Sequence, residues 1–377
     1  MIPKWKALRR TGCRVPALAL AVAAVAAVLV GCTTGAGGAV TSGGSSAEAV
    51  QMESMQPVAT FHGPAEAFAP APDKHVMVLV CGNFGLGCVR EAAGARAAFE
   101  SMGWTVDVVD GRLDPTVWNR VVKQAVDSGV DGIIALGANP NLMGEAMAAV
   151  HAEDVPFVMV SQSPKPGDLP GVDSWVRPDA VKGGNDIGTW IAGDSGGQGS
   201  VLVIDAPEYA DIMVRNDSLV ATLGEQCAGC TVHRVAISTP TMGTTLAPTV
   251  TSQLQQNPDV TYVWTPDDAY ANFVAQGIMQ AGKTTSVKLV SGAGAPEALA
   301  RIRDGQQAAD LATPDVYMGW LAADTLARLI SGQPSQEVWD VPQRFFTAAN
   351  IGDGDYSAGW DVEFDYKTVF KNMWGVQ

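Results

Sequence analysis

The chain has 377 residues, 47% of them hydrophobic, and a formal net charge of −15 at pH 7. This length is too great for one small domain and allows two, each with its own core. Nucleic acids and anionic membrane surfaces both attract an excess of Lys and Arg, so the acidic balance excludes both as the main partner.

The first 31 residues have the layout of an export signal. A basic start precedes an uncharged apolar run at residues 15–30, which is shorter than the roughly 20 residues that span a membrane. The run ends in Leu-Val-Gly-Cys at residues 29–32, which resembles a bacterial lipobox. The resemblance implies cleavage before Cys32 and lipid on its sulfur, anchoring the protein to the outer face of the cytoplasmic membrane. The alternative is an ordinary secretory signal with a chance cysteine.

Residues 32–73 are expected to form a flexible tether. The stretch that follows Cys32 is rich in Gly, Ser, Thr and Ala, which bury too little surface to fold. Pro64, Pro70 and Pro72 are expected to keep the remainder extended. The folded protein should therefore begin near residue 74.

Four of the six cysteines lie in the predicted folded part, and an oxidising compartment favours disulfides there. We expect local pairing of Cys81 with Cys88 and of Cys227 with Cys230. The last two form a Cys-x-x-C motif, which redox and zinc sites also use. That alternative is less favoured because no second Cys-x-x-C and no His-x-x-x-His accompanies it, so no metal site and no cofactor are predicted.

Short apolar runs alternate with helical patterns from residue 75 onward. The run at 76–80 is continuously apolar, as expected of a strand covered on both faces. Strands are predicted at 76–80, 104–110, 131–137 and 156–160, and helices at 89–102, 115–128 and 141–151. This alternation predicts the parallel sheet of an α/β fold.

A second series of the same kind begins near residue 179. Its expected helices cover 180–192, 210–225, 246–257, 268–282, 296–305 and 316–332. Its expected strands cover 200–206, 231–237, 260–264, 287–292 and 308–313. The two series predict two similar α/β lobes rather than one continuous sheet.

Residues 193–197 spell Gly-Asp-Ser-Gly-Gly, the nucleophile motif of trypsin-like proteases. Such a protease needs two antiparallel β-barrels and a histidine base oriented by a buried acid. The four histidines lie in the tether, beside or within predicted strands, or at a helix end, where none has the setting of that base: His62, His75, His151 and His233. We interpret the motif as a loop after a helix, with Gly193 as the C-terminal glycine.

Five dispersed stretches carry a resemblance to a known family. They are 76–111, 131–141 with 154–162, 177–192, 257–283 and 304–333. In this order they resemble the periplasmic sugar-binding proteins of the ribose-binding type, the solute receptors of ABC importers. Paired glycines in 177–192 and the Pro-Asp-Val start of 257–283 match the family pattern, although Phe273 stands where the family has glycine.

The resemblance implies a type I periplasmic-binding-protein fold of two Rossmann-like lobes, each a parallel sheet flanked by helices. The chain should cross between lobes near Pro178, Thr313 and Pro342, and these crossings would be hinges. The N-terminal lobe would contain 74–178 and 314–342, and the C-terminal lobe 179–313 and 343–377. Ligands would bind in the cleft between them, at the carboxyl ends of the strands.

The resemblance also places candidate ligand contacts just after strands or at helix starts. These are Phe84, Gly85, Ser161, Gln162, Arg215, Thr241, Asp267, Ala293 and Thr313. Ser161 and Gln162 stand where the family often has an aspartate–arginine pair, and Ala293 replaces a common aspartate. Met242 is the alternative to Thr241, Trp175 and Trp264 are further candidates, and Asp268 is expected to cap a helix. We therefore expect a less charged pocket than the family's.

The predicted function is that of an extracytoplasmic solute-binding lipoprotein of an ABC importer, monomeric and partnered by permease subunits. Its ligand would be a small polar molecule, such as a sugar, a polyol or a related metabolite. The alternative is a receptor that presents its solute to a sensor kinase or chemoreceptor. An enzyme is disfavoured because the predicted cleft has one carboxylate and no base–nucleophile pair, so no catalytic residue is predicted.

Overall fold

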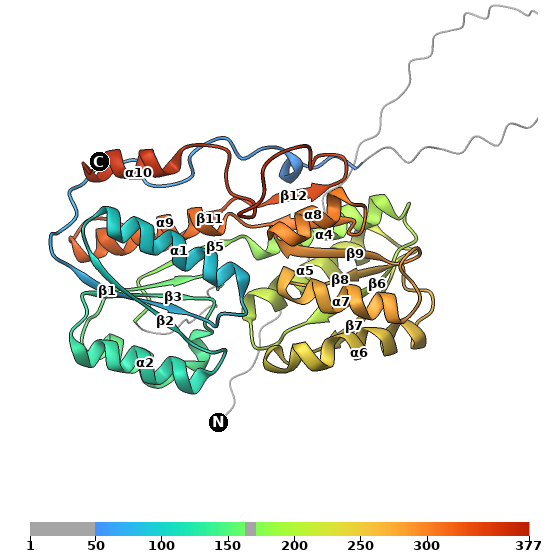
Figure 1. The fold of residues 1–377 in the computed structure, drawn as a ribbon, viewed down its shortest axis with the longest axis horizontal. Coiled ribbons are helices and arrows are strands. Elements are labelled where there is room, and N and C mark those ends of the chain that lie inside the picture. The colour runs from blue at the N-terminus through green and yellow to red at the C-terminus, as the bar shows by residue number, and fades with distance from the viewer. Residues whose placement is uncertain (1–49, 163–170, 377) are drawn as a thin grey trace, which may run out of the picture. The chain divides into compact units, whose positions relative to one another are not determined.

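The computed structural model describes residues 50–162 and 171–376. The predicted signal sequence and Cys32 therefore lie outside the described residues. Two α/β lobes lie side by side (Figure 1). The N-terminal lobe contains strands β1 (His75–Val80), β2 (Thr105–Asp110), β3 (Gly132–Leu136), β4 (Phe157–Val160), β5 (Ser174–Pro178) and β11 (Val338–Val341). Its helices are α1 (Leu86–Ser101), α2 (Pro115–Ser128), η2 (Pro140–Leu142), α3 (Gly144–Ala152), α9 (Asp315–Ile330) and α10 (Tyr366–Trp374).

The C-terminal lobe repeats this plan. Its strands are β6 (Ser200–Asp205), β7 (Thr231–Ala236), β8 (Tyr262–Trp264), β9 (Lys288–Ala293), β10 (Ala309–Ala312) and β12 (Arg344–Thr347). Its helices are α4 (Ala180–Asp194), α5 (Ala210–Gln226), η3 (Thr239–Thr241), α6 (Met242–Gln256), α7 (Asp268–Gln280) and α8 (Pro296–Arg303), and a short helix η1 (Glu53–Met55) precedes β1 in the chain.

Each lobe has its own six-stranded sheet, so the predicted fold class is confirmed. The strand orders are β11-β5-β4-β3-β1-β2 and β12-β10-β9-β8-β6-β7. All paired strands of the first sheet are parallel. In the second sheet only β12 runs antiparallel to its neighbour, β10.

Helices cover both faces of each sheet, which explains the continuously apolar strands. In β1, Val76 and Val78 pack toward α1 and α9, whereas Met77 and Leu79 pack toward α2 and α3. In the other lobe, α4 and α5 cover one face, and α6 and α7 the other. Since alternate side chains point to opposite faces, a strand covered twice must be apolar at every position.

Helices α1 and α9 cross in close contact because each has a glycine at the crossing. A Cβ atom on Gly94 would overlap the carbonyl of Val316, and one on Gly319 would overlap the carbonyl of Glu91. Only glycine permits such an approach of two backbones. The crossing fixes the first turns of α1 and α9 beside the carboxyl ends of the strands.

Between residues 171 and 376, the chain passes from one sheet to the other at three places. These are Pro178–Asp179 between β5 and α4, Thr313–Pro314 between β10 and α9, and Pro342–Gln343 between β11 and β12. They correspond to the three positions that the resemblance implied.

The C-terminal segment differs from the prediction that 343–377 belongs to the C-terminal lobe. Strand β12 does pair in that lobe, but α10 packs on α9 of the N-terminal lobe. The physical reason is an aromatic stripe at every fourth residue of α10, which needs an apolar partner surface. Phe370 and Trp374 are buried against Trp320.

The predicted tether also ends earlier than expected. Met55 is buried in the core of the C-terminal lobe, and Phe61 packs against Tyr317 and Phe370. The amide of Phe68 donates to the carbonyl of Met373. Residues 50–73 therefore run across both lobes beside the C-terminal segment (Figure 1). Isolated apolar side chains among Ala and Pro anchor this stretch, and residues 32–49 lie outside the described part.

The Gly-Asp-Ser-Gly-Gly motif is a turn, as predicted, but the helix ends later than expected. Helix α4 continues to Asp194, and the left-handed glycines are Gly196 and Gly197, not Gly193. The Ser195 hydroxyl donates to the carbonyl of Ala192. The serine side chain thus satisfies a backbone carbonyl at the C-terminal end of α4. Within 50–162 and 171–376, no helix combines the length and the apolar character that a bilayer span requires.

Candidate functional site

A cavity lies between the lobes at the carboxyl ends of both sheets. Its empty volume is about 840 Å³, including the space that opens to solvent. The predicted ligand residues that line it are Phe84, Gly85, Ser161, Gln162, Arg215, Asp267, Ala293 and Thr313. Thr241 does not line it, because its side chain is exposed and its hydroxyl donates to the carbonyl of Ser238. Its neighbour Met242 lines the cavity instead.

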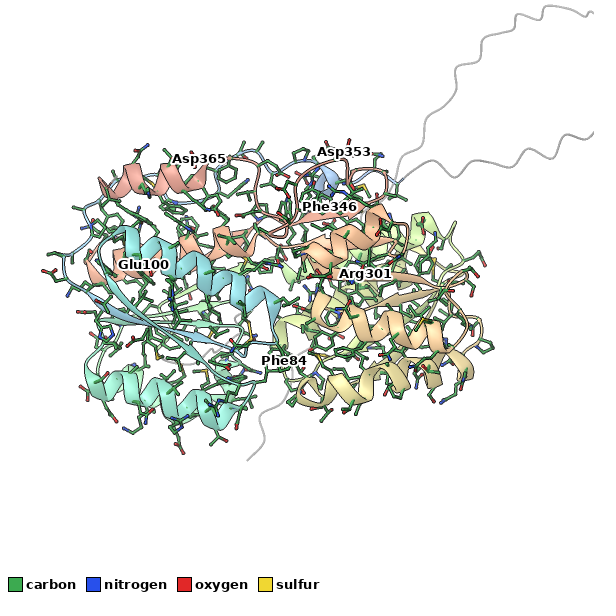
Figure 2. The ribbon with its side chains drawn as sticks, in the orientation of Figure 1. Phe84, Glu100, Arg301, Phe346, Asp353 and Asp365 are labelled. Carbon is green, nitrogen blue, oxygen red and sulfur yellow. A yellow bond between two sulfur atoms is a disulfide. The ribbon has the colours of Figure 1, made fainter. Side chains whose placement is uncertain are left out.

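The loop after β1 carries the most exposed part of the site. Cys81 is bonded to Cys88 across this loop, and Cys227 to Cys230 elsewhere, which is the local pairing expected from the sequence. Phe84 is 71% exposed and lies between the two lobes (Figure 2). An aromatic ring in this place offers an apolar face to a ligand.

Glu91, on the first part of α1, is a buried cavity residue that the sequence analysis missed. Its Oε1 accepts a hydrogen bond from the Ser161 hydroxyl at the end of β4. Burial raises the pKa of Glu91 to about 8, with a smaller contribution from Asp315, while the Ser161 hydrogen bond opposes the shift. The sequence offered one signal for Glu91: it lies among alanines on the face of the predicted helix that packs into the core.

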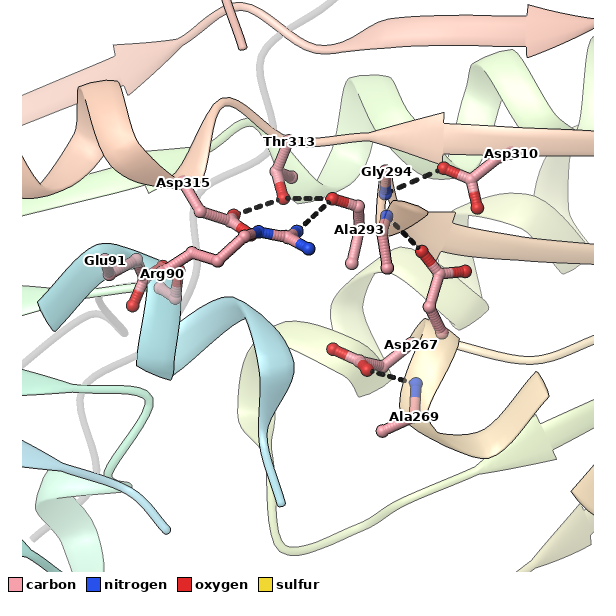
Figure 3. A network of polar contacts seen from close by, with 12 residues as sticks. Arg90, Glu91, Asp267, Ala269, Ala293, Gly294, Asp310, Thr313 and Asp315 are labelled. Carbon is pink, nitrogen blue, oxygen red and sulfur yellow. Dashed lines mark hydrogen bonds and ion pairs between the residues drawn. The ribbon is translucent and has the colours of Figure 1, made fainter. Parts of the chain in front are cut away.

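Arg90 joins the two lobes beside Glu91. Its guanidinium forms an ion pair with Asp315, the first residue of α9, and donates to the Ala293 carbonyl at 2.6 Å (Figure 3). The Thr313 hydroxyl donates to the other oxygen of Asp315 at 2.6 Å. The second crossing of the chain is therefore tied to α1 and β9 at once.

Ala293 has a backbone φ of 130°, a conformation that residues other than glycine rarely adopt. The surrounding network holds it there. Asp310 accepts from the Gly294 amide at 2.9 Å, and Asp268 accepts from the Ala295 amide at 2.7 Å (Figure 3). Strained residues persist where the surroundings over-determine them, often at binding sites.

Arg215 and Asp267 form the opposite wall of the cavity. The Arg215 guanidinium lies 5.5 Å from the centre of the Trp264 ring and donates to the Pro266 carbonyl at 2.7 Å. Asp267 accepts from the Ala269 amide at 2.8 Å, so it caps α7. The predicted capping residue, Asp268, is instead buried in the network under Ala293.

Burial raises the pKa of Asp267 to about 6. Its hydrogen bond from the Ala269 amide and the charges of Arg90 and Arg215 oppose the shift, and Asp315 adds to it. Trp264 is fully buried and Trp175 is 4% exposed, and neither is among the residues that line the cavity. These two tryptophans are core residues.

One further contact links the lobes. The Asn139 side chain, after β3, donates to the backbone carbonyl of Glu208, after β6, at 2.9 Å. Together with the bond from Arg90 to Ala293, it joins the two lobes across the cleft.

The expectation of a pocket less charged than the family's stays a prediction. The ionisable residues that line the cavity are Glu91, Asp211, Arg215, Asp267 and Asp315. Most of their carboxyl groups lie at the starts of helices, whereas the resemblance placed the site mainly at strand ends. A helix N-terminus favours a carboxylate, so the first turn is a common place for one.

The two lobes, the three crossings and the ligand-sized cavity between the sheets define a two-lobed solute-binding fold. A family model described as a periplasmic binding protein domain matches residues 89–334. The chain belongs to this family.

Individual relatives are distant. The ribose import binding protein of Salmonella typhimurium is 23% identical over 259 residues, which cover 66% of this chain and 82% of that protein. A glucose-galactose binding protein from Geobacillus stearothermophilus has a TM-score of 0.67 at 18% identity, over 75% of this chain and all of that one. A solute-binding protein from Agrobacterium vitis with bound allitol has a TM-score of 0.68 at 19% identity, over 74% of this chain and 97% of that one. At these identities the structural matches show a shared fold.

Proposed function

We propose that this protein binds a small polar solute, such as a sugar or a polyol, in the cleft between its lobes and delivers it to an ABC importer. The observation that carries the proposal is the cavity itself, whose polar side chains come from both lobes. Binding between two lobes couples ligand contact to closure about the crossings. Relatives that bind ribose, hexoses and allitol support this ligand class.

The proposed ligand contacts are the predicted residues that line the cavity, without Thr241 and with Met242, Glu91 and Asp315 added. Phe84 would cover one face of the ligand, while Arg215 and Asp267 would bind its hydroxyl groups through charge-assisted hydrogen bonds. The proposal assigns no catalytic residue and no cofactor.

The proposed location is the outer face of the cytoplasmic membrane, with the protein a monomer held by lipid on Cys32. Permease subunits of the importer would receive the closed form. Lipidation is tested by labelling cells with a radioactive fatty acid. The label should be present in the natural chain and absent after Cys32→Ser, and label retained in that variant would contradict the assignment.

Ligand binding is tested by thermal unfolding against a panel of sugars and polyols. A ligand at a hundredfold its dissociation constant should stabilise the protein by about 2.7 kcal/mol. Ser195→Ala, at the turn after α4, is the control and should bind the same ligand equally well. Absence of stabilisation by every member of the panel would contradict the proposal.

A further inference from the structure

Two buried oxygen atoms, on residues that line the cavity, lack a hydrogen-bond partner within the described residues. They are Oε2 of Glu91 and Oε1 of Gln162, whose residues are only 1% and 2% exposed. The other Glu91 oxygen accepts from Ser161, and the Gln162 amide nitrogen donates to the Gly137 carbonyl at 3.2 Å. Buried polar atoms in proteins nearly always have partners, so these two acceptors require a donor from outside the protein.

Ionisable groups surround these acceptors. Arg90 is neutralised by its ion pair with Asp315. Of the other ionisable residues lining the cavity, Glu91 and Asp267 interact with each other, and Arg215 acts on Asp267. Ionising both carboxyl groups in a buried cavity is unfavourable, and a bound cation would favour it.

We propose that the ligand of this cleft carries a protonated amine, as an amino sugar or an amine-bearing polyol does, and that the ammonium binds Glu91 and Gln162. This inference rests on the proposed function and specifies its ligand class. An ammonium offers three donors and no acceptor, which suits two unpartnered oxygens. The hydroxyl groups of the same ligand would then lie toward Arg215, whose Nε also lacks a hydrogen-bond partner.

Calorimetry at pH 8 with matched ligand pairs tests the inference. The pairs are glucose and glucosamine, galactose and galactosamine, and sorbitol and 1-amino-1-deoxysorbitol. At least one amine should bind 100-fold more tightly than its hydroxyl counterpart. N-acetylation of that amine, which removes the charge, should abolish the preference.

Glu91→Gln removes the charge but keeps an oxygen for the Ser161 hydroxyl. This variant should reduce the preference for the amine at least tenfold. The matched control is Glu100→Gln, which makes the same charge change at an exposed position of the same helix and should keep the full preference.

A second measurement needs only the natural protein. Titration of the amine in buffers of different ionisation enthalpy should show net proton release at pH 7, because a bound cation favours ionised carboxylates. Glu91 faces Asp315, Arg90 and Asp267, and Asp267 also faces Arg215, so the released protons would come from this group.

The outcomes separate the two proposals. If a neutral sugar binds as tightly as its amine, or if no protons are released, the amine inference is wrong while solute binding stands. If Glu91→Gln and Glu100→Gln behave alike, the ammonium does not bind at Glu91. If neither member of any pair binds, the amine inference is wrong, and solute binding is then decided by the unfolding panel of sugars and polyols.

Discussion

The lobes contact each other through two very different regions. In the first region, residues 50–73 and 348–376 lie across both lobes, and we call these two segments the cross-lobe layer. Buried side chains of residues 348–376 join one apolar cluster with residues of α8, α9 and β12, and Phe61 and Phe68 pack against this cluster, whereas Met55 packs in the C-terminal lobe. On the cleft side, the contacts between the lobes include single hydrogen bonds, from Asn139 to Glu208 and from Arg90 to Ala293.

This difference indicates where the molecule opens. Apolar burial is non-directional and survives small rotations of the packed elements, whereas a hydrogen bond is lost when its atoms separate. A hydrogen bond contributes only about 0.5–1.5 kcal/mol net, so the two cleft contacts are easily broken. We therefore expect the lobes to separate at the cleft while the cross-lobe layer stays packed and acts as the pivot.

Substitution of one phenylalanine in each region is the strongest test of this contrast. Phe370 is fully buried in the cross-lobe layer, 5.3 Å from the Phe61 ring and 5.5 Å from the Trp374 ring, measured between centres. Phe370→Ala should lower the free energy of unfolding by about 3–5 kcal/mol, measured by chemical denaturation.

Phe84→Ala is the matched change on the cleft side. Because Phe84 is 71% exposed, the free energy of unfolding should change by less than about 0.5 kcal/mol, while ligand affinity falls. Equal destabilisation by the two variants would show that the cross-lobe layer contributes no more to stability than the cleft loop.

The second test uses the buried acid of the cleft. The pKa of Glu91 is raised from 4.5 to about 8 in the folded protein. Between these values the unfolded chain has lost a proton that the folded protein keeps, so Glu91 lowers the free energy of unfolding as pH rises from 4.5 to 8.

Glu91→Gln should remove this decrease in the free energy of unfolding, because glutamine does not titrate. Without ligand, the free energy of unfolding of the variant should equal that of the natural protein near pH 4.5. At pH 8.5 it should be larger by about 2–4 kcal/mol. Denaturation curves at both pH values measure the difference, with Glu100→Gln as the control of equal charge. Curves with the same pH dependence for Glu91→Gln and the natural protein would show that Glu91 is not held protonated by the cleft.

The central part of the fold was predictable from the hydrophobic pattern, and the cross-lobe layer was not. Runs such as 76–80 are apolar at every position because helices cover both faces, and that pattern is local. The bonds from Phe68 to Met373 and from Asn350 to Met55 join residues about 300 positions apart. Isolated apolar residues such as Met55, Phe61 and Phe68 leave no periodic signal, and the periodic stripe of α10 does not reveal which lobe it packs on.

The short strands were missed for a related reason. β5 contains Arg177 and Pro178, and β11 and β12 have four residues each at the edges of the sheets. A run of four or five residues that contains charged residues or proline is too short to show a clear strand pattern. The sequences of these strands therefore resemble loops.

The site was predictable where ligand residues follow strands. This rule placed Asp267 in the right region, the resemblance placed Arg215 on a helix, and both residues line the cavity. The rule missed Glu91 and Asp315 because they lie on helices, and their approach depends on the glycine crossing of α1 and α9. The charge of the cavity therefore followed from helix packing, which strand-end positions do not reveal.

The smallest expected effect comes from the single bond between Asn139 and Glu208. Asn139→Asp removes the donated hydrogen bond and keeps the oxygen that accepts from the Asn141 amide. Loss of about 1 kcal/mol from the closed form should weaken ligand binding roughly fivefold with little change in stability. Asn141→Ala, in the same turn, leaves the bond between the lobes in place and should bind normally. If the two variants bind the ligand equally well, this bond does not contribute to closure, and the cleft side would depend on Arg90 and the ligand itself.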